Sequence, residues 1–275
     1  MNLNVFEILI LGSNSAVPMK GRYPSAQLVN IHEKLFLMDC GEGTQNRLAE
    51  HNIKRSRISH IFISHLHGDH VLGLPGLLNS FSLAGRLDEI HIYGPVGLDK
   101  YLNDCLENTY SHIQYDLHFH ILDHNHSSTC YQDDSCSVIH FPLIHRVPTI
   151  GYKFEENRLK RDLDQITGSQ KFRSYCYCSD NYVTEALLPY IKDVTVLYHE
   201  TTYLHELKDK AEATKHSTAR DVAKMAKHAN VGQLVTGHYS SRYDNIEVFY
   251  EECRNFFDSV ILGQEGTKID LSYST

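Results

Sequence analysis

A short motif near residue 65 constrains this chain more than any other feature. Four side chains that can bind a metal lie within six residues: His65, His67, Asp69 and His70. The motif follows the apolar run Ile58–Ser64, which predicts a buried strand, and precedes an apolar helical pattern that begins at Val71. Gly68 permits a sharp turn between the two elements. Imidazole and carboxylate are the ligands of catalytic zinc, so we predict a metal site rather than a loop of satisfied polar groups.

Ligand-type side chains also follow four other apolar runs of the chain. The runs 138–141, 175–178, 194–198 and 233–236 lead to His145, to Asp180, to His199 and Glu200, and to His238. In α/β proteins, sites gather at the carboxyl ends of strands, so we expect these side chains to meet. Seven ligands divided between two metals, with one shared carboxylate, would leave room for a water molecule between them.

A second histidine-rich segment competes with this interpretation. It contains His118, His120, His124 and His126. Its apolar residues alternate with the histidines as in a half-buried strand, and no Asp-His pair follows at the right spacing. We therefore expect a solvated strand face and turn, not a third metal site. We assign structural roles to four single histidines, which are His60, His91, His112 and His140.

Short apolar runs alternate with helical patterns along the chain, which is typical of α/β folds. The expected strands are 6–11, 28–31, 35–39, 58–64, 90–93, 117–122, 138–141, 150–154, 175–178, 194–198, 233–236 and 259–262. The expected helices are 44–51, 71–84, 98–107, 185–191, 218–229 and 246–256. Several strands follow one another without a helix between them. We therefore expect two mixed β-sheets that pack together and are flanked by helices.

The clearest helix is expected over 218–229. Ser217 is a favourable N-cap residue, and apolar side chains follow at helical spacing. These side chains are Ala219, Val222, Ala223 and Ala226. The chain has no internal repeat and no Pro/Gly/Ser-rich linker, so we expect a single domain over residues 1–275.

Composition limits the location and the partners. The formal charge of −8 argues against nucleic-acid binding by general electrostatic attraction. It does not exclude a nuclease, because bound zinc would add positive charge at the site. Seven scattered cysteines suit a reducing compartment, and Cys176 and Cys178 are expected on one buried strand face. The run Val5–Leu11 lacks the flanks of a signal peptide, and no apolar run is long enough to span a membrane, so we expect a soluble cytoplasmic protein.

Together the motifs resemble a known family. H-x-H-x-D-H is the signature of the metallo-β-lactamase superfamily, which is specific for the fold and not for the substrate. Further segments are similar to motifs of ribonuclease Z over nearly the whole chain. These are residues 11–18, 39–45 (Asp-Cys-Gly-Glu-Gly-Thr-Gln), 73–78, 145–152, 199–203 (His-Glu-Thr-Thr-Tyr), 216–219 (His-Ser-Thr-Ala) and 236–243. The pairing of the 199–203 and 216–219 motifs distinguishes ribonuclease Z from the rest of the superfamily.

The resemblance implies an αβ/βα sandwich with two zinc ions at one edge, or manganese in their place. One metal would be bound by His65, His67 and His145, and the other by Asp69, His70 and His238, with Asp180 bridging them. Asp39 would support the site without binding a metal. We expect Asp69 to accept the proton of the attacking water, and Glu200 with His216 to protonate the leaving 3′ oxygen. A buried structural carboxylate and a helix-start histidine are the alternatives for Glu200 and His216.

The implied activity is removal of the 3′ trailer from precursor tRNA, by a homodimer. The segment Leu74–Leu83 is the expected dimer contact, with burial against its own sheet as the alternative. Another phosphodiester or sulfate-ester hydrolase of the same fold is the first rival function. A non-catalytic RNA-binding or metal-storage protein is the second rival, although binding alone would not need Glu200 and His216.

The sequence departs from the family in two places. Asn181 follows Asp180 where the family usually has Thr. The family also carries a long Gly/Pro-rich arm between the counterparts of Tyr152 and Asp180, and this arm grips the tRNA elbow. Here only 27 residues intervene, Lys153–Ser179, with one Gly and no Pro. Either the arm is short or missing, or a stretch is absent from this sequence.

Overall fold

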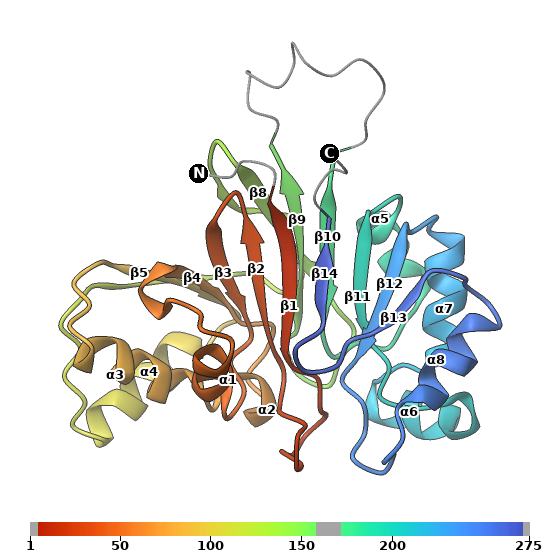
Figure 1. Cartoon of the computed structure of the whole chain (residues 1–275), viewed down its shortest axis with the longest axis horizontal. Coiled ribbons are helices and arrows are strands. Elements are labelled where there is room, and N and C mark those ends of the chain that lie inside the picture. Colours follow the sequence, from red (N-terminus) through yellow and green to blue (C-terminus); the bar gives the residue numbers. More distant parts are fainter. Residues whose placement is uncertain (1–4, 158–171, 272–275) are drawn as a thin grey trace.

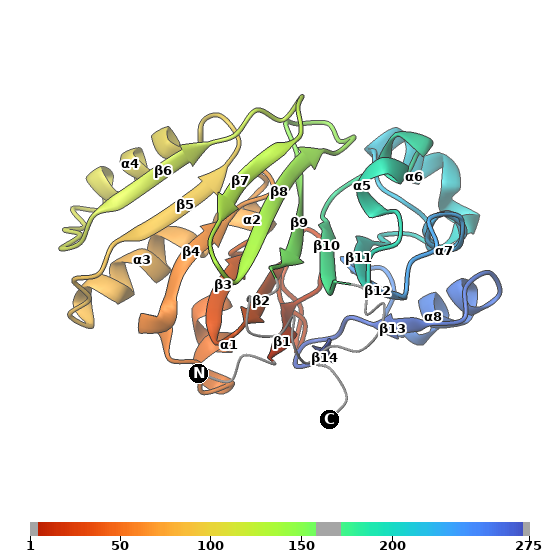
Figure 2. The same ribbon diagram turned by 90° about the horizontal axis from the view of Figure 1, so that it is seen from above.

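Two seven-stranded sheets face each other and carry helices on their outer sides, as the computed structural model shows (Figure 1). The structure describes residues 5–157 and 172–271. The second view, from above, shows the two sheets side by side with α3 and α4 outside one and α7 and α8 outside the other (Figure 2). This is the two-sheet α/β arrangement expected from the sequence.

The first sheet combines an antiparallel and a parallel half. Its order is β14 (Lys268–Asp270), β1 (Phe6–Gly12), β2 (Ala26–Ile31), β3 (Lys34–Met38), β4 (Ile58–Phe62), β5 (Ile90–Gly94) and β6 (Leu117–Ile121). Strands β14 to β3 are antiparallel, and β3 to β6 are parallel. The outer side carries α1 (Thr44–Glu50), α2 (Gly68–Val71), α3 (Leu74–Leu83) and α4 (Leu98–Asn108), with the short η1 (Arg55–Arg57).

The second sheet has the same mixed character. Its order is β13 (Val260–Leu262), β12 (Gln233–Gly237), β11 (Val196–Glu200), β10 (Ser174–Cys178), β9 (Ile150–Glu156), β8 (Cys136–Pro142) and β7 (Ser128–Gln132). Strands β10 to β13 are parallel, and β7 to β10 are antiparallel. Its helices are α5 (Leu188–Ile191), α6 (Lys208–Thr214), α7 (Ala219–His228) and α8 (Glu247–Arg254), with η2 (Glu185–Leu187) and η3 (His205–Leu207).

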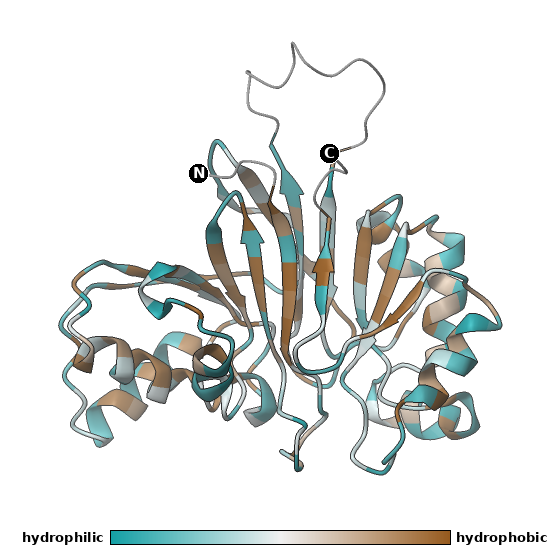
Figure 3. Ribbon diagram, in the orientation of Figure 1, coloured by the Kyte–Doolittle hydropathy of each residue, from teal (hydrophilic) through white to brown (hydrophobic). Residues whose placement is uncertain are grey.

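Alternation along the strands divides the core into three layers. In β1, Phe6, Ile8 and Ile10 join the cluster between the sheets, whereas Leu9 and Leu11 join the cluster under the helices. Side chains of a strand point alternately to its two faces, so one strand supplies both layers. A third cluster lies under α7 and α8. Apolar residues accordingly run along the strands in both sheets (Figure 3).

Several expected elements are altered in the structure. The expected helix 71–84 is interrupted, so that α2 ends at Val71 and α3 begins at Leu74. Gly73 lies between them, and a Cβ there would lie 2.2 Å from the carbonyl oxygen of Gly41, so close backbone packing holds the break. The edge strands β7 and β14 and the helix α6 were not predicted, because their sequences are short and polar.

The N-cap of α7 is Thr218 and not Ser217, which corrects the sequence prediction. The hydroxyl of Thr218 accepts a hydrogen bond from the backbone N–H of Asp221. Ser217 instead donates from Oγ to the carbonyl of Asn181 at 2.6 Å and accepts from the N–H of Val183. Its hydroxyl therefore holds the loop after β10 against the start of α7.

The segment Leu74–Leu83 is buried mainly against its own sheet. Leu74, Leu77, Leu78 and Phe81 belong to the cluster under the first sheet. Leu83, at the end of α3, is 81% exposed. Burial against its own sheet thus accounts for four apolar side chains of this segment. Only Leu83, at its end, is exposed and could contact a second subunit. None of the described helices is long and apolar enough to cross a membrane.

A buried ion pair beside the end of β9 makes part of the stability depend on pH. Arg173 donates hydrogen bonds to both carboxylate oxygens of Glu156, and His32 Nε2 lies 2.8 Å from Oε1. Burial raises the pKa of Glu156, but Arg173 and His32 outweigh it and lower the pKa to about 2. Because the folded pKa is depressed, this stabilisation is present above the unfolded pKa and is lost as the pH falls toward 2.

We expect Glu156→Gln to lower the free energy of unfolding by about 3 kcal/mol at pH 7, because the buried charge of Arg173 would lose the carboxylate that accepts two of its hydrogen bonds. Urea unfolding at pH 7 and at pH 3 measures this effect. The difference between variant and wild type should shrink at pH 3, because this pH lies below the pKa of Glu156 in the unfolded chain, where protonation removes part of the stabilisation. An equal difference at both pH values would contradict the assignment.

Candidate metal centre

The strand ends of both sheets converge on one cluster of imidazoles and carboxylates. The loop after β4 and the start of α2 supply His65, His67, Asp69 and His70, and the ends of β8, β10 and β12 lead to His145, Asp180 and His238. Parallel strands present their carboxyl ends at one edge, which brings distant segments together there. All seven predicted ligands thus lie in the same region.

A first group of ligand atoms consists of His65, His67, His145 and Asp180, all within 4.8 Å of one another. His67 Nδ1 lies 3.0 Å from His65 Nε2 and 3.3 Å from His145 Nε2. Asp180 Oδ2 lies 3.5 Å from His65 Nε2 and 3.6 Å from His145 Nε2. Three ring nitrogens and one carboxylate oxygen therefore surround a common point, as the ligands of a tetrahedral ion do.

A second group consists of Asp69, His70 and His238, and the other oxygen of Asp180 adjoins it. Asp180 Oδ1 lies 3.1 Å from His238 Nε2 and 3.4 Å from His70 Nε2. Asp69 Oδ2 lies 3.3 Å from His238 Nε2 and 3.6 Å from His70 Nε2. One carboxylate thus presents Oδ2 to the first group and Oδ1 to the second, which is the geometry of a bridging ligand.

The residues present fit a pair of cations. His70 Nε2 and Asp180 Oδ1 are buried, and neither has a hydrogen-bond partner among the described residues. Buried polar atoms are normally satisfied, and two such atoms that face one centre suit the ligands of a cation. Burial lowers the pKa of His65 to about 4, so this imidazole stays neutral and can act as a ligand. Burial alone would raise the pKa of Asp180, but the surrounding histidines hold it well below its usual range.

Asp39 holds His70 through the ring nitrogen that faces away from the cluster. Its Oδ2 accepts hydrogen bonds from His70 Nδ1 at 2.7 Å, from Tyr177 Oη at 2.7 Å and from Ser64 Oγ at 2.8 Å. Its Oδ1 accepts from the N–H of Ser64 at 2.7 Å. Asp39 has a left-handed φ of 52° at the end of β3, which turns its carboxylate toward the cluster. A carboxylate behind a ligand imidazole fixes its tautomer and its orientation.

Two more of the predicted ligand histidines, His145 and His238, are held by hydrogen bonds to their Nδ1 atoms. His145 Nδ1 donates to the backbone carbonyl of Lys215 at 2.9 Å, which leaves Nε2 for the first group. His238 Nδ1 lies 3.0 Å from the hydroxyl of Thr202, which leaves Nε2 for the second group. Lys215 and His238 both have left-handed backbone conformations, with φ of 58°. Sequence reasoning did not identify Lys215 or Thr202, although Thr202 lies inside the 199–203 motif.

Glu200 and His216 form a pair beside the metal ligands. His216 Nδ1 donates to Glu200 Oε1 at 3.0 Å, and the N–H of Ser217 donates to the same oxygen at 2.9 Å. Thr202 donates to Oε2 from its N–H and its hydroxyl, each at 2.8 Å. Burial lowers the pKa of His216, but Glu200 outweighs it and raises the pKa to about 9. His216 Nε2 points toward the ligands, 4.0 Å from Asp180 Oδ2.

Asn181, the departure from the family motif, binds several parts of the site together. Its Oδ1 accepts from the N–H of Ile144 at 2.8 Å, next to His145. Its Nδ2 donates to His199 Nε2 at 3.1 Å, and His199 Nδ1 donates to the backbone carbonyl of Glu200. Neither His199 nor Asn181 belongs to a group that could hold a metal among the described residues. No sequence pattern pointed to this role.

An open cavity of about 320 Å³ leads to the cluster. It is lined by His67, Asp69, Asp180, His216 and His238 and by Ser15, Ala16, Gly68, Leu72 and Arg146. Arg146 is exposed and has no carboxylate partner among the described residues. Sequence reasoning missed this cation, although it directly follows His145.

The histidine-rich segment forms no metal site within the described part of the chain. His118 and His120 lie on β6, where they stack on His91 and Tyr93 of β5 with ring centroids 4.9 and 4.2 Å apart. Both side chains are half-buried and not solvated as expected, whereas Leu117 and Phe119 of the opposite face pack against the cluster under the helices.

Comparisons with known proteins relate the chain to ribonuclease Z and match it to one further family model. The family model described as Anti-Pycsar protein Apyc1 matches residues 6–256. A ribonuclease Z of Cytophaga hutchinsonii is 40% identical, covering 97% of this chain and 96% of the relative. The crystal structure of human tRNase Z, short form, superposes with a TM-score of 0.78 at 28% identity, covering 97% and 100%. The metallo-β-lactamase fold protein YhfI from Bacillus subtilis, at 15% identity, has a TM-score of 0.76 over 97% and 99%.

Proposed function

This chain belongs to the ribonuclease Z family of metallo-β-lactamase-fold proteins, and on this premise we propose that it is a metal-dependent endoribonuclease that removes the 3′ trailer from precursor tRNA. The observation that carries the proposal is the Glu200–His216 pair, which lies beside a complete set of metal ligands. Burial lowers the pKa of His216, but Glu200 raises it to about 9, and a protonated imidazole suits a proton donor better than a metal ligand. We further propose that the chain works as a single domain in the cytoplasm.

We propose two zinc ions per chain, with manganese as the alternative. His65, His67 and His145 would bind one ion, and Asp69, His70 and His238 the other, with Asp180 shared between them. When bound, such a pair stabilises charge on phosphoryl oxygens and makes water a stronger nucleophile at neutral pH. The outer contacts of Asp39, Thr202 and Lys215 hold the ligand imidazoles in the required orientation.

The side chains of the site would move two protons. Asp69 lies on the open side of the cluster, where its Oδ2 accepts from the N–H of Ala16 at 2.7 Å, and it would accept the proton of the attacking water. His216 would donate a proton from Nε2 to the leaving 3′ oxygen. Glu200 holds the other ring nitrogen and stabilises the imidazolium that stores this proton.

Arg146 would bind a phosphate of the RNA at the mouth of the cavity. The guanidinium lines the same cavity as His67 and His216, and an arginine can bind a phosphate through two hydrogen bonds. We expect Arg146→Met to raise KM for precursor tRNA about tenfold and to leave kcat within about threefold. Steady-state cleavage kinetics measure both constants, with Lys100→Met on α4 as a remote control for the loss of one charge. A fall in kcat with an unchanged KM would contradict this role.

Cleavage of a precursor tRNA, with the ends of both products mapped, tests the proposed function. We expect a single cut that leaves a 3′ hydroxyl on the tRNA. The alternative, another phosphodiester or sulfate-ester hydrolase of the same fold, predicts turnover of bis(p-nitrophenyl) phosphate or an aryl sulfate without cleavage of the precursor.

The tRNA-binding arm of the family would be shortened in this chain. The connection between β9 and β10 includes residues 158–171, which lie outside the described residues. The alignment with the ribonuclease Z of Porphyromonas gingivalis runs over 301 positions, although the chain has 275 residues. The relative therefore contains positions without a counterpart here. A short arm would make fewer contacts with the tRNA elbow. Contacts near the metal centre would then have to supply more of the affinity for tRNA.

We propose that the enzyme is a homodimer. The exposed side chains Leu83 and Leu87, at the end of α3 and just beyond it, are 81% and 76% exposed and offer an apolar contact. Light scattering at micromolar concentration should give twice the mass of one chain, and Leu83→Lys with Leu87→Lys should give the mass of a single chain. A wild-type protein with the mass of one chain would overturn the proposal.

A further inference from the structure

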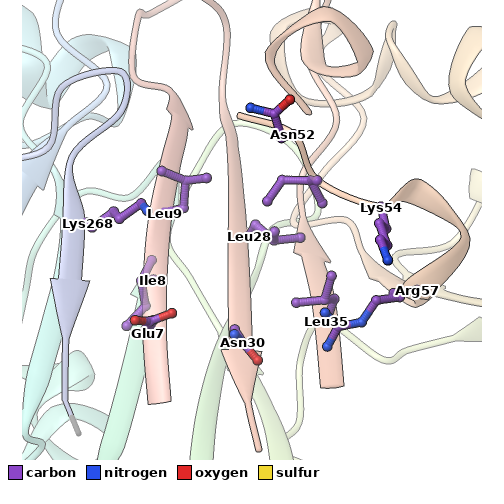
Figure 4. A pocket seen from close by; sticks show the side chains of 11 residues that line it. Glu7, Ile8, Leu9, Leu28, Asn30, Leu35, Asn52, Lys54, Arg57 and Lys268 are labelled. Carbon is purple, nitrogen blue, oxygen red and sulfur yellow. The ribbon is translucent and has the colours of Figure 1, made fainter. Parts of the chain in front are cut away.

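A second cavity, of about 310 Å³, lies on the outer face of the first sheet (Figure 4). It is formed by β1, β2, β3 and β14 together with the segment from Asn52 to Arg57. It shares no lining residue with the cavity at the metal centre. Cavities that bind small ligands begin at about this size.

The floor of this second cavity is apolar because of strand register. Leu9 of β1 pairs with Leu28 of β2, and both point to the outer face, as does Leu35 of β3. These leucines lie in a row between the strands and the η1 segment (Figure 4). The three leucines are 7%, 3% and 5% exposed, so the floor offers a small aliphatic contact for a ring.

Cations lie on both sides of this floor. Lys268 of β14 pairs with Leu9 and reaches the cavity from one side, while Lys54 and Arg57 reach it from the other (Figure 4). None of the three forms a salt bridge with a carboxylate in the described ranges 5–157 and 172–271. Arg57 donates to the backbone carbonyl of Glu33, which orients the guanidinium without neutralising it. Glu7 is the single carboxylate of the lining, so the cavity carries a net positive charge.

An amide completes the lining. Asn30 lies beside Leu35 in the sheet register, and its Oδ1 is buried without a hydrogen-bond partner among the described residues. A buried acceptor without a donor is costly, and a ligand that presents an N–H would satisfy it.

From these observations we propose that the second cavity is a nucleotide-binding site. The planar base would pack on Leu9, Leu28 and Leu35, and an exocyclic amino group of the base would donate to Asn30 Oδ1. The phosphate would bind to the cations at the rim, chiefly Arg57 and Lys268. The nucleotide is either free in solution or part of an RNA strand, and the two sources share this chemistry.

Calorimetric titration of the metal-replete full chain with AMP tests the proposal. We expect one site with a dissociation constant on the order of 100 µM. Adenosine and ribose 5-phosphate should each bind at least about tenfold more weakly, because each lacks one half of the recognised chemistry. Arg57→Gln and Lys268→Gln should each weaken AMP about tenfold, whereas Lys100→Gln on α4 should not change it. Both rim residues are exposed, so the variants should fold, which circular dichroism checks.

A comparison of two nucleotides that differ in one amino group tests the role of Asn30. Purine riboside 5′-monophosphate lacks only the amino group of AMP and should bind about tenfold more weakly to the wild type. Asn30→Leu should abolish that difference. AMP could also reach the metal centre, so binding must persist in Asp180→Ala. The nucleotide site is wrong if the protein does not bind AMP. It is also wrong if AMP binding is lost in Asp180→Ala and kept in Arg57→Gln. Neither result would contradict the proposed nuclease activity.

The same variants identify the source of the nucleotide. If the site holds a nucleotide of an RNA strand, Arg57→Gln should weaken binding of precursor tRNA. The plot of log affinity against log salt concentration should then become less steep by about 0.7, because one phosphate contact is lost. If the nucleotide is free, RNA binding should be unchanged and AMP should not compete with it. Either outcome supports the nucleotide site when AMP binding meets the criteria above.

Discussion

Asp180→Ala is expected to lower kcat/KM for precursor tRNA by on the order of 10³-fold and to remove about one metal ion per chain. The reason is that Asp180 presents one oxygen to each group of histidines, at 3.5 Å from His65 Nε2 and 3.1 Å from His238 Nε2. Losing the shared carboxylate takes a ligand from both ions at once. The substitution also leaves the buried imidazoles without the carboxylate between them. Elemental analysis of the metal-replete protein, together with single-turnover cleavage, measures both effects.

Asp104→Ala on α4 is the matched control, since it removes one carboxylate from an exposed i,i+4 pair with Lys100. It should keep the full metal content and the full rate. Should Asp180→Ala keep two metals and wild-type cleavage, the bridging assignment is wrong. A wild-type protein with one metal or none after metal-replete purification would sink the two-metal proposal itself.

Replacing either Glu200 or His216 is expected to slow single-turnover cleavage by between about 10² and 10⁴-fold, without loss of metal. Neither side chain is a proposed ligand of either ion. His216 Nδ1 donates to Glu200 Oε1 at 3.0 Å, so Glu200 acts through the imidazole of His216. The double variant should therefore be little slower than the slower single variant.

Glu200 is fully buried and accepts hydrogen bonds from Ser217 and Thr202, so Glu200→Gln is the preferred single variant for this cycle. Gln keeps the shape and loses the charge that stabilises imidazolium. His216→Gln is its counterpart. Multiplied losses in the double variant would contradict a shared relay, and a fall in zinc content would indicate that the pair supports the ligands instead.

Local patterns in the sequence predicted the elements that carry their own signal. The spacing of His65, His67, Asp69 and His70 after an apolar run predicted a strand, a turn and a cluster of ligands, and these four side chains lie together. Ala219 and Val222 at helical spacing predicted α7, and both are fully buried. Such patterns depend only on neighbours along the chain, because side-chain direction follows the period of the helix or strand.

Tertiary structure decided what depends on contacts between distant segments. Thr202, Asn181 and the carbonyl of Lys215 orient the site, but each acquires its role only where β10, β11 and the loop before α7 meet. The strands β7 and β14 have little apolar pattern and are held by pairing with β8 and β1.

The second cavity illustrates the same limit. Its cations come from positions as far apart as Arg57 and Lys268, and only the register of β14 against β1 brings the latter beside Leu9. Residue type and spacing along the chain therefore determined which side chains this protein has available for chemistry. Which of them face one another was decided by sheet order and register, since hydrogen bonds between strands, and not the sequence of any one strand, set those positions.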